Sequence, residues 1–177
     1  MSAMSNSRHI LVLGGARSGK STYAEGLAEG HTGPLVYIAT AEPRDGEMSE
    51  RIAAHVERRG PSWKTVEAPL ELASAITQNA ADGMFMLVDC ITFWLTNVML
   101  NEQDTGVAAA ELADVIAKAP GTIVLVSNEV GLGIVPENAL ARRFRDEAGW
   151  VNQKLAAICD KVVFVAAGLP LHLKGKD

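Results

Sequence analysis

The sequence predicts an α/β fold in which a mostly parallel central sheet is covered by helices on both faces. Short apolar runs of strand length recur along the chain, and segments with helical spacing of apolar residues separate them. Strands that alternate with helices in this way form crossover units and therefore a parallel sheet. At 177 residues, with 48% hydrophobic residues, the chain has the size of one domain. We assign residues 1–8 to a polar N-terminal extension and residues 9–177 to a single domain.

A phosphate-binding loop is the strongest motif in the chain. Residues 14–21 fit the pattern GxxxxGKS, after an apolar run at residues 9–13 and before a helical segment at residues 21–29. Glycines let backbone N–H groups approach phosphate oxygens, and the following helix directs its positive end at the same anion. We predict a P-loop, RecA-like fold with Lys20 on the β and γ phosphates and Ser21 on Mg²⁺. The alternative is a glycine-rich turn that only links strand to helix.

Composition argues against several other classes. A net charge of −5 and a pI near 5.4 do not suit a protein that coats nucleic acid. The chain has no run near the roughly 18 apolar residues that cross a bilayer, and residues 1–8 lack the apolar stretch of a signal peptide. Cys90 and Cys159 form neither a CxxC pair nor a metal-ligand spacing. We therefore expect a cytoplasmic protein without a membrane span.

The next strand is expected at residues 35–39, and small residues follow it. Ligands of parallel sheets gather at the carboxyl ends of strands, which places Ala39, Thr40 and Ala41 near the phosphate loop. An ordinary strand end fits these residues equally well. A strand at residues 63–67 and a helix at residues 70–79 come later in the chain.

Between these strands, residues 47–59 predict a helix that carries a histidine. Met48, Ile52 and Val56 form an apolar stripe at helical spacing; His55 lies within it, and Arg59 follows one turn later. One interpretation is a core or interface histidine beside a solvated basic flank. The other is a reactive imidazole surrounded by phosphate-binding arginines.

An apolar run closed by a carboxylate occupies residues 84–89. Asp89 at the end of such a strand is typical of the second nucleotide motif, in which the carboxylate holds Mg²⁺ directly or through water. The pattern is weak by itself and gains weight beside the phosphate loop. The remaining elements are a helical or irregular stretch at 91–100, a helix at 107–117, a strand at 122–126, a glycine-containing loop, a long helix from Pro136, a strand at 161–166 and an irregular tail from Gly168.

Several segments together carry a resemblance to one family. They are the phosphate loop, Ala39 to Ala41, Arg51 to His55, Trp63 to Glu67, Asp89 to Thr92 and Ser127 to Pro136. From about His9 to Ala167 the chain resembles the bifunctional adenosylcobinamide kinase / adenosylcobinamide-phosphate guanylyltransferases of cobalamin synthesis. The resemblance implies phosphorylation of adenosylcobinamide from ATP or GTP, then transfer of GMP from GTP onto that phosphate, by a homotrimer.

The resemblance also implies the site residues. His55 matches the histidine that carries GMP, and Lys20 and Asp89 complete the catalytic set, with Ser21 and Asp89 on Mg²⁺. The strand-end carboxylate is Glu in some relatives, so direct and water-mediated metal contact by Asp89 are both open. The implied nucleotide contacts are Gly14, Gly15, Ala16, Arg17, Ser18, Gly19, Lys20, Ser21, Ala39, Thr40, Ala41, Val56, Glu57, Arg58, Arg59, Glu67 and Asp89.

Two other functions use the same phosphate loop. A plain small-molecule or nucleotide kinase would form no covalent nucleotide on the protein. A GTP-controlled switch would bind a partner without small-molecule turnover, and the chain lacks the guanine-reading NKxD pattern that such switches often carry.

Overall fold

The computed structural model describes residues 8–42 and 46–175, which form a seven-stranded sheet in the order β3-β2-β4-β5-β1-β6-β7. In this order, the first six strands, from β3 at one edge to β6, are all parallel to their neighbours. The last strand, β7, pairs antiparallel with β6. The elements are β1 Arg8–Gly14, α1 Lys20–Gly26, β2 Leu35–Ala39, α2 Gly46–Arg59, β3 Trp63–Glu67, α3 Leu72–Asn79, β4 Phe85–Asp89, α4 Ile91–Leu100, α5 Thr105–Lys118, β5 Thr122–Asn128, α6 Ala139–Ile158, β6 Lys161–Ala166 and β7 Leu169–Lys174.

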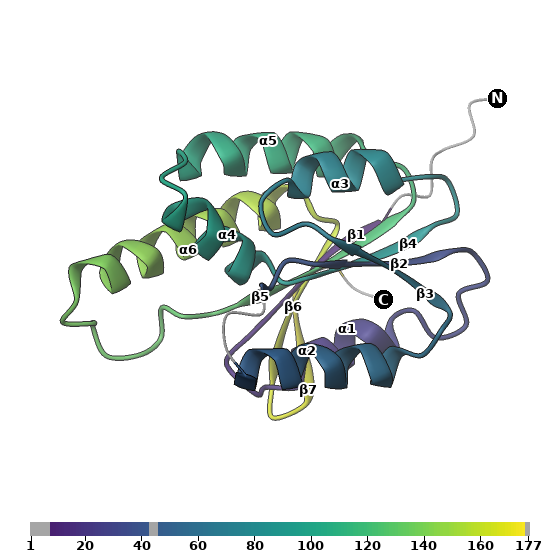
Figure 1. Cartoon of the computed structure of the whole chain (residues 1–177), viewed down its shortest axis with the longest axis horizontal. Helices are drawn as coiled ribbons and strands as arrows, with labels where there is room; N and C mark the ends of the chain where they lie inside the picture. The colour runs from purple at the N-terminus through teal and green to yellow at the C-terminus, as the bar shows by residue number, and fades with distance from the viewer. Residues whose placement is uncertain (1–7, 43–45, 176–177) are drawn as a thin grey trace.

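Helices cover both faces of the sheet, as the sequence predicts. Helices α1 and α2 lie on one face, and α3, α4, α5 and α6 lie on the other (Figure 1). Alternate residues of β1 enter the two resulting cores: Leu11 and Leu13 pack on the side of α3 to α6, and Ile10 and Val12 on the side of α1. Within the described ranges, no helix is long and apolar enough to cross a membrane.

Most of the predicted elements are confirmed, but several boundaries shift. Helix α1 ends at Gly26, three residues before the predicted end. Helix α5 begins at Thr105 instead of Val107, because the Asp104 side chain accepts a hydrogen bond from Val107 N and caps the helix. Helix α6 begins at Ala139 instead of Pro136, because the Asn138 side chain caps it by accepting from Leu140 N and Ala141 N.

The prediction of an irregular tail after Gly168 is wrong. Residues 169–174 form β7, which pairs with β6 at the edge of the sheet. Ala167 and Gly168 have φ values of 51° and 76°, which is the positive-φ pair that a tight two-residue hairpin requires. Pro170 is compatible with the strand because an edge strand leaves some backbone N–H groups unpaired.

A buried polar network joins the carboxyl ends of β2 and β4 to α4. The Thr40 hydroxyl donates to Cys90 O at 2.6 Å and accepts from Cys90 N at 2.8 Å. The Asn97 amide in α4 donates to Thr40 O at 2.9 Å and to Pro69 O at 3.0 Å. Thr40 and Asn97 are both buried, so these contacts fix the strand ends that face the candidate site.

We expect Thr40→Val to lower the free energy of unfolding by about 1–3 kcal/mol, because it leaves the buried Cys90 N–H without an acceptor. Urea unfolding measures the loss. Thr77→Val is the matched control, since the Thr77 hydroxyl is exposed and, within the described part of the chain, donates only to Ala73 O of its own helix. Equal losses in the two variants would contradict the role of the network.

Candidate active site

The phosphate-binding loop connects β1 to α1 in a tight turn. Gly19 has φ of 94° and Arg17 has φ of 54°, so the loop uses the left-handed region twice. A side chain at Gly14 would collide with the Ser18 hydroxyl and with Val165 O. These positions explain why the loop needs glycine at its first and sixth positions.

Two later segments of the chain hold the loop in place. Glu129 N donates to Gly14 O at 3.0 Å, and Gly168 N donates to Ser18 O at 2.8 Å. The Lys20 ammonium donates to Gly15 O at 3.0 Å within the loop itself. The Ser18 hydroxyl is buried without a hydrogen-bond partner among the described residues. An anion in the loop would therefore meet a nearby cation and an unused hydroxyl.

A cavity of about 560 Å³ lies beside the loop, at the carboxyl ends of β2, β3, β4 and β5. This is the edge at which ligands of parallel sheets bind. The lining residues are Lys20, Ser21, Tyr37, Ala39, Ala41, Glu42, Ser49, Ala53, Val56, Arg59, Thr65, Glu67, Pro69, Asp89, Cys90, Phe93 and Asn128.

The cavity brings together a large part of the predicted site. Its lining includes Lys20 and Ser21 from the loop and Asp89 from the end of β4. It also includes the predicted nucleotide contacts Ala39, Ala41, Val56, Arg59 and Glu67. Hydroxyl and carboxylate oxygens are the ligands that Mg²⁺ prefers, so Ser21 and Asp89 fit the predicted metal.

Other predicted residues do not line this cavity. Thr40 is buried and its hydroxyl is engaged with Cys90, while Glu57, Ala16 and Arg17 are exposed. Gly14, Gly15, Ser18 and Gly19 form the loop backbone next to the cavity. His55 and Arg58 belong to α2, and their side chains lie outside the described part of the structure.

Arg59 enters the cavity from the end of α2. Its guanidinium carbon lies 3.2 Å from the centre of the Tyr37 ring, and its Nε and Nη1 atoms are buried without a partner among the described residues. Buried N–H groups in proteins nearly always have an acceptor. A nucleotide phosphate in the cavity would supply one, which agrees with the predicted role of Arg59.

Two titratable side chains in the cavity stay neutral. Burial, with the nearby charge of Asp89, raises the pKa of Cys90 to about 12. The same two causes raise the pKa of Tyr37 well above its usual value. Cys90 is therefore a thiol at neutral pH. Because the thiolate is the nucleophilic form of cysteine, Cys90 does not provide a competing covalent site.

Sequence reasoning missed several residues of the lining. Tyr37 and Phe93 look like core residues in the sequence, and their place in the cavity depends on how α2 and α4 pack. Asn128 follows the predicted strand at residues 122–126, so its position at a strand end could have indicated it.

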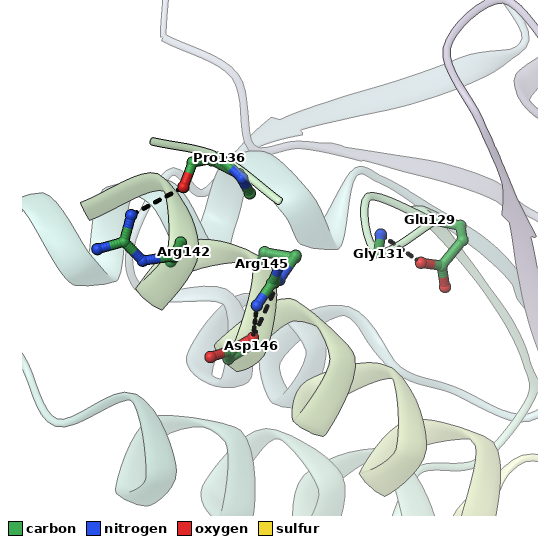
Figure 2. A network of polar contacts seen from close by, with 6 residues as sticks. All are labelled: Glu129, Gly131, Pro136, Arg142, Arg145 and Asp146. Carbon is green, nitrogen blue, oxygen red and sulfur yellow. Dashed lines mark hydrogen bonds and ion pairs between the residues drawn. The ribbon is translucent and has the colours of Figure 1, made fainter. Parts of the chain in front are cut away.

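The segment between β5 and α6 forms an exposed loop that α6 supports. In Figure 2, Arg142 donates to Pro136 O at 2.8 Å, and Gly131 N donates to the Glu129 carboxylate at 2.6 Å. Arg145 pairs with Asp146 in the same view. Leu132 and Ile134 at the tip are 81% and 98% exposed. Arg142 therefore stabilises the loop.

The family described as "Cobinamide kinase / cobinamide phosphate guanyltransferase" matches residues 10–173. The chain is 49% identical over 168 residues to a bifunctional adenosylcobalamin biosynthesis protein, CobP, of Pseudomonas aeruginosa, with 94% of this chain and 97% of that protein covered. It is 43% identical over 180 residues to the bifunctional adenosylcobalamin biosynthesis protein CobU of Salmonella typhimurium, with 93% and 99% covered.

Solved structures with low sequence identity share the fold. An ATPase of the type III secretion system of pathogenic bacteria superposes with a TM-score of 0.57 at 11% identity, covering 93% of this chain and 56% of that one. The ATPase EscN of enteropathogenic E. coli superposes with a TM-score of 0.59 at 14% identity, covering 89% and 41%. These likenesses support the predicted fold class alone.

Proposed function

The chain belongs to the cobinamide kinase / cobinamide phosphate guanyltransferase family and is a bifunctional enzyme of cobalamin synthesis, and we propose that one cavity serves both of its reactions. The substrates in this proposal are adenosylcobinamide, its phosphate, and ATP or GTP. The observation that carries it is the lining of the cavity, in which Lys20 and Ser21, Asp89 and the last turn of α2 meet.

Phosphoryl transfer depends mainly on positioning and on neutralising the charge around the γ phosphate. Lys20 carries a positive charge at the start of α1, where the helix dipole also favours an anion. Ser21 and Asp89 would hold Mg²⁺, which adds further positive charge at the phosphates. Their shared place in the cavity supports the kinase half of the proposal.

Guanylyl transfer requires attack at the α phosphate, and we assign that attack to His55. A neutral imidazole nitrogen forms a bond to the α phosphorus, and the bond to the β-phosphate bridge breaks, so that pyrophosphate leaves. An oxygen of adenosylcobinamide phosphate then attacks the same phosphorus and displaces the imidazole. His55 lies four residues before Arg59 in α2, and residues at this spacing share a helix face.

GTP labelled at either the α or the γ phosphate tests this assignment in the wild-type protein. The label from the α position should remain on the denatured protein, survive alkali and be released by acid, as a phosphorus–nitrogen bond requires. The label from the γ position should not remain. Absence of an α-labelled adduct would contradict the assignment and favour a plain kinase.

We expect Asp89→Asn to lower kinase turnover at least tenfold, because it keeps the size of the side chain and removes the charge that attracts Mg²⁺. Nucleotide binding without metal should change far less, since the loop backbone is unaltered. Turnover measured across Mg²⁺ concentrations checks this. Asp114→Asn is the control, because Asp114 is exposed on α5 and pairs with Lys118. Wild-type rates in Asp89→Asn at every Mg²⁺ concentration would contradict the role.

We also propose that the protein acts in the cytoplasm as a homotrimer, as the family resemblance implies. Light scattering of the purified protein measures the molar mass in solution. A mass of one or two chains would contradict the trimer.

A further inference from the structure

Tyr37 is a buried residue of β2 that contacts the cavity and Arg59 at the same time. Its side chain is 5% exposed and lines the cavity. The Arg59 guanidinium carbon lies 3.2 Å from the centre of its ring, which is the geometry of a close cation–π contact. This contact joins the sheet to the last residue of α2.

Other aromatic rings hold the Tyr37 ring in place. Trp63 of β3 meets Tyr37 edge-on, with ring centres 6.4 Å apart and planes at 87°. Phe85 of β4 meets Trp63 in turn, at 6.0 Å and 80°. Edge-to-face pairs of this kind are favourable beyond the area that they bury. The three rings lie on adjacent strands and give Arg59 a rigid surface.

The contact with Tyr37 leaves hydrogen-bonding capacity on Arg59. Its Nε and Nη1 atoms are buried, and no described residue accepts from them. A planar guanidinium that lies against a ring keeps its N–H groups at the edge of the plane, where they can bind phosphate oxygens. The ring thus orients the donors and leaves them available to a ligand.

We propose that Tyr37 is a positioning residue for guanylyl transfer, which fixes the last turn of α2 through Arg59. The proposal rests on the proposed function, in which His55 one turn earlier is the nucleophile. The new element of the proposal is that the sheet, through Tyr37, fixes the position of the last turn of α2 relative to the phosphate loop. Tyr37 acts through its ring, so the hydroxyl group is not required.

The test compares Tyr37→Leu, which removes the ring, with Tyr37→Phe, which keeps it. In Tyr37→Leu, the rate of adduct formation from α-labelled GTP should fall about 3- to 30-fold, the range that a cation–π contact corresponds to. Kinase turnover should fall less than adduct formation does, since Lys20, Ser21 and Asp89, to which we assign that step, lie outside α2. Tyr37→Phe should restore adduct formation to near the wild-type rate.

Phe85→Leu is the matched control, because it makes the same aromatic-to-leucine change in the same ring row without touching Arg59. It should change the ratio of the two activities less than Tyr37→Leu does, because Phe85 contacts Trp63 and not Tyr37 in this row of rings. Equal losses of both activities in Tyr37→Leu, or the same change of ratio in Phe85→Leu, would overturn the proposal. An undiminished adduct in Tyr37→Leu would also overturn it.

Amide hydrogen exchange separates this proposal from the assignment of His55. Amides of residues 56–59 should exchange faster in Tyr37→Leu than in wild type, Tyr37→Phe or Phe85→Leu, whatever the nucleophile is. A wild type without an adduct but with this exchange pattern would contradict the histidine step and support the positioning role. Unchanged exchange in Tyr37→Leu would contradict the positioning role alone.

Discussion

Lys20→Ala is expected to lose both activities while the protein stays folded. The ammonium group lies in the phosphate loop and lines the cavity, so each reaction loses its charge at the triphosphate. Removing one preorganised group that stabilises developing charge typically costs about 100- to 1000-fold in turnover. We expect a loss of at least this size in the kinase step, measured as steady-state turnover with adenosylcobinamide.

Stability should change little in the same variant. The hydrogen bond from Lys20 to Gly15 O is half-buried and worth about 1 kcal/mol, and alanine is a good helix former at the start of α1. Lys118→Ala is the matched control for turnover, because Lys118 is exposed and pairs only with Asp114 among the described salt bridges. Wild-type kinase turnover in Lys20→Ala would contradict the role of the phosphate loop.

His55→Ala is expected to abolish the covalent adduct and guanylyl transfer, and to leave phosphorylation of adenosylcobinamide largely intact. The two activities should separate because, in the proposed function, the kinase step depends on Lys20, Ser21 and Asp89, and not on the imidazole. Loss of the nucleophile removes the covalent route itself, so the expected effect is complete rather than partial. Adduct and transfer are measured with α-labelled GTP, and phosphorylation with γ-labelled nucleotide.

Two histidines serve as matched controls. His31 contacts Gly83 O at 2.9 Å, on the side of the molecule where β4 begins, and His172 is exposed on β7. Neither lines the cavity. Alanine at either position should leave the adduct unchanged. An undiminished adduct in His55→Ala would place the nucleophile elsewhere.

The sequence predicted the parts of the fold that local patterns determine. The strands predicted at residues 35–39 and 63–67 coincide with β2 and β3. The first is an apolar run between turn residues and the second alternates apolar and polar residues, and both patterns are typical of strands. The prediction of an irregular tail after Gly168 was wrong. Pro170 argues against a strand unless the strand is known to lie at the edge of a sheet. That knowledge depends on the order of strands in the sheet, which no local pattern supplies.

The candidate site was predictable to a similar degree. The phosphate loop and Asp89 follow from motifs whose chemistry restricts the residue types, and both reach the cavity. Tyr37 was missed because an aromatic residue in a strand indicates a core position, which is also true here. The positioning role that we propose for Tyr37 depends on its contact with Arg59 at the end of α2, a tertiary contact that periodicity does not report.

The position of β1 in the sheet affects when the site can form during synthesis. Arg8 of β1 pairs with Thr122 of β5, and Ile10 pairs with Lys161 of β6, so the first strand has no neighbour among the strands that directly follow it. The loop after β1 receives its outer hydrogen bonds from Glu129 and Gly168. A ribosome must therefore complete most of the chain before the earliest motif acquires its native surroundings. Nascent chains that stop before β5 should not retain nucleotide, although they already contain the whole phosphate loop.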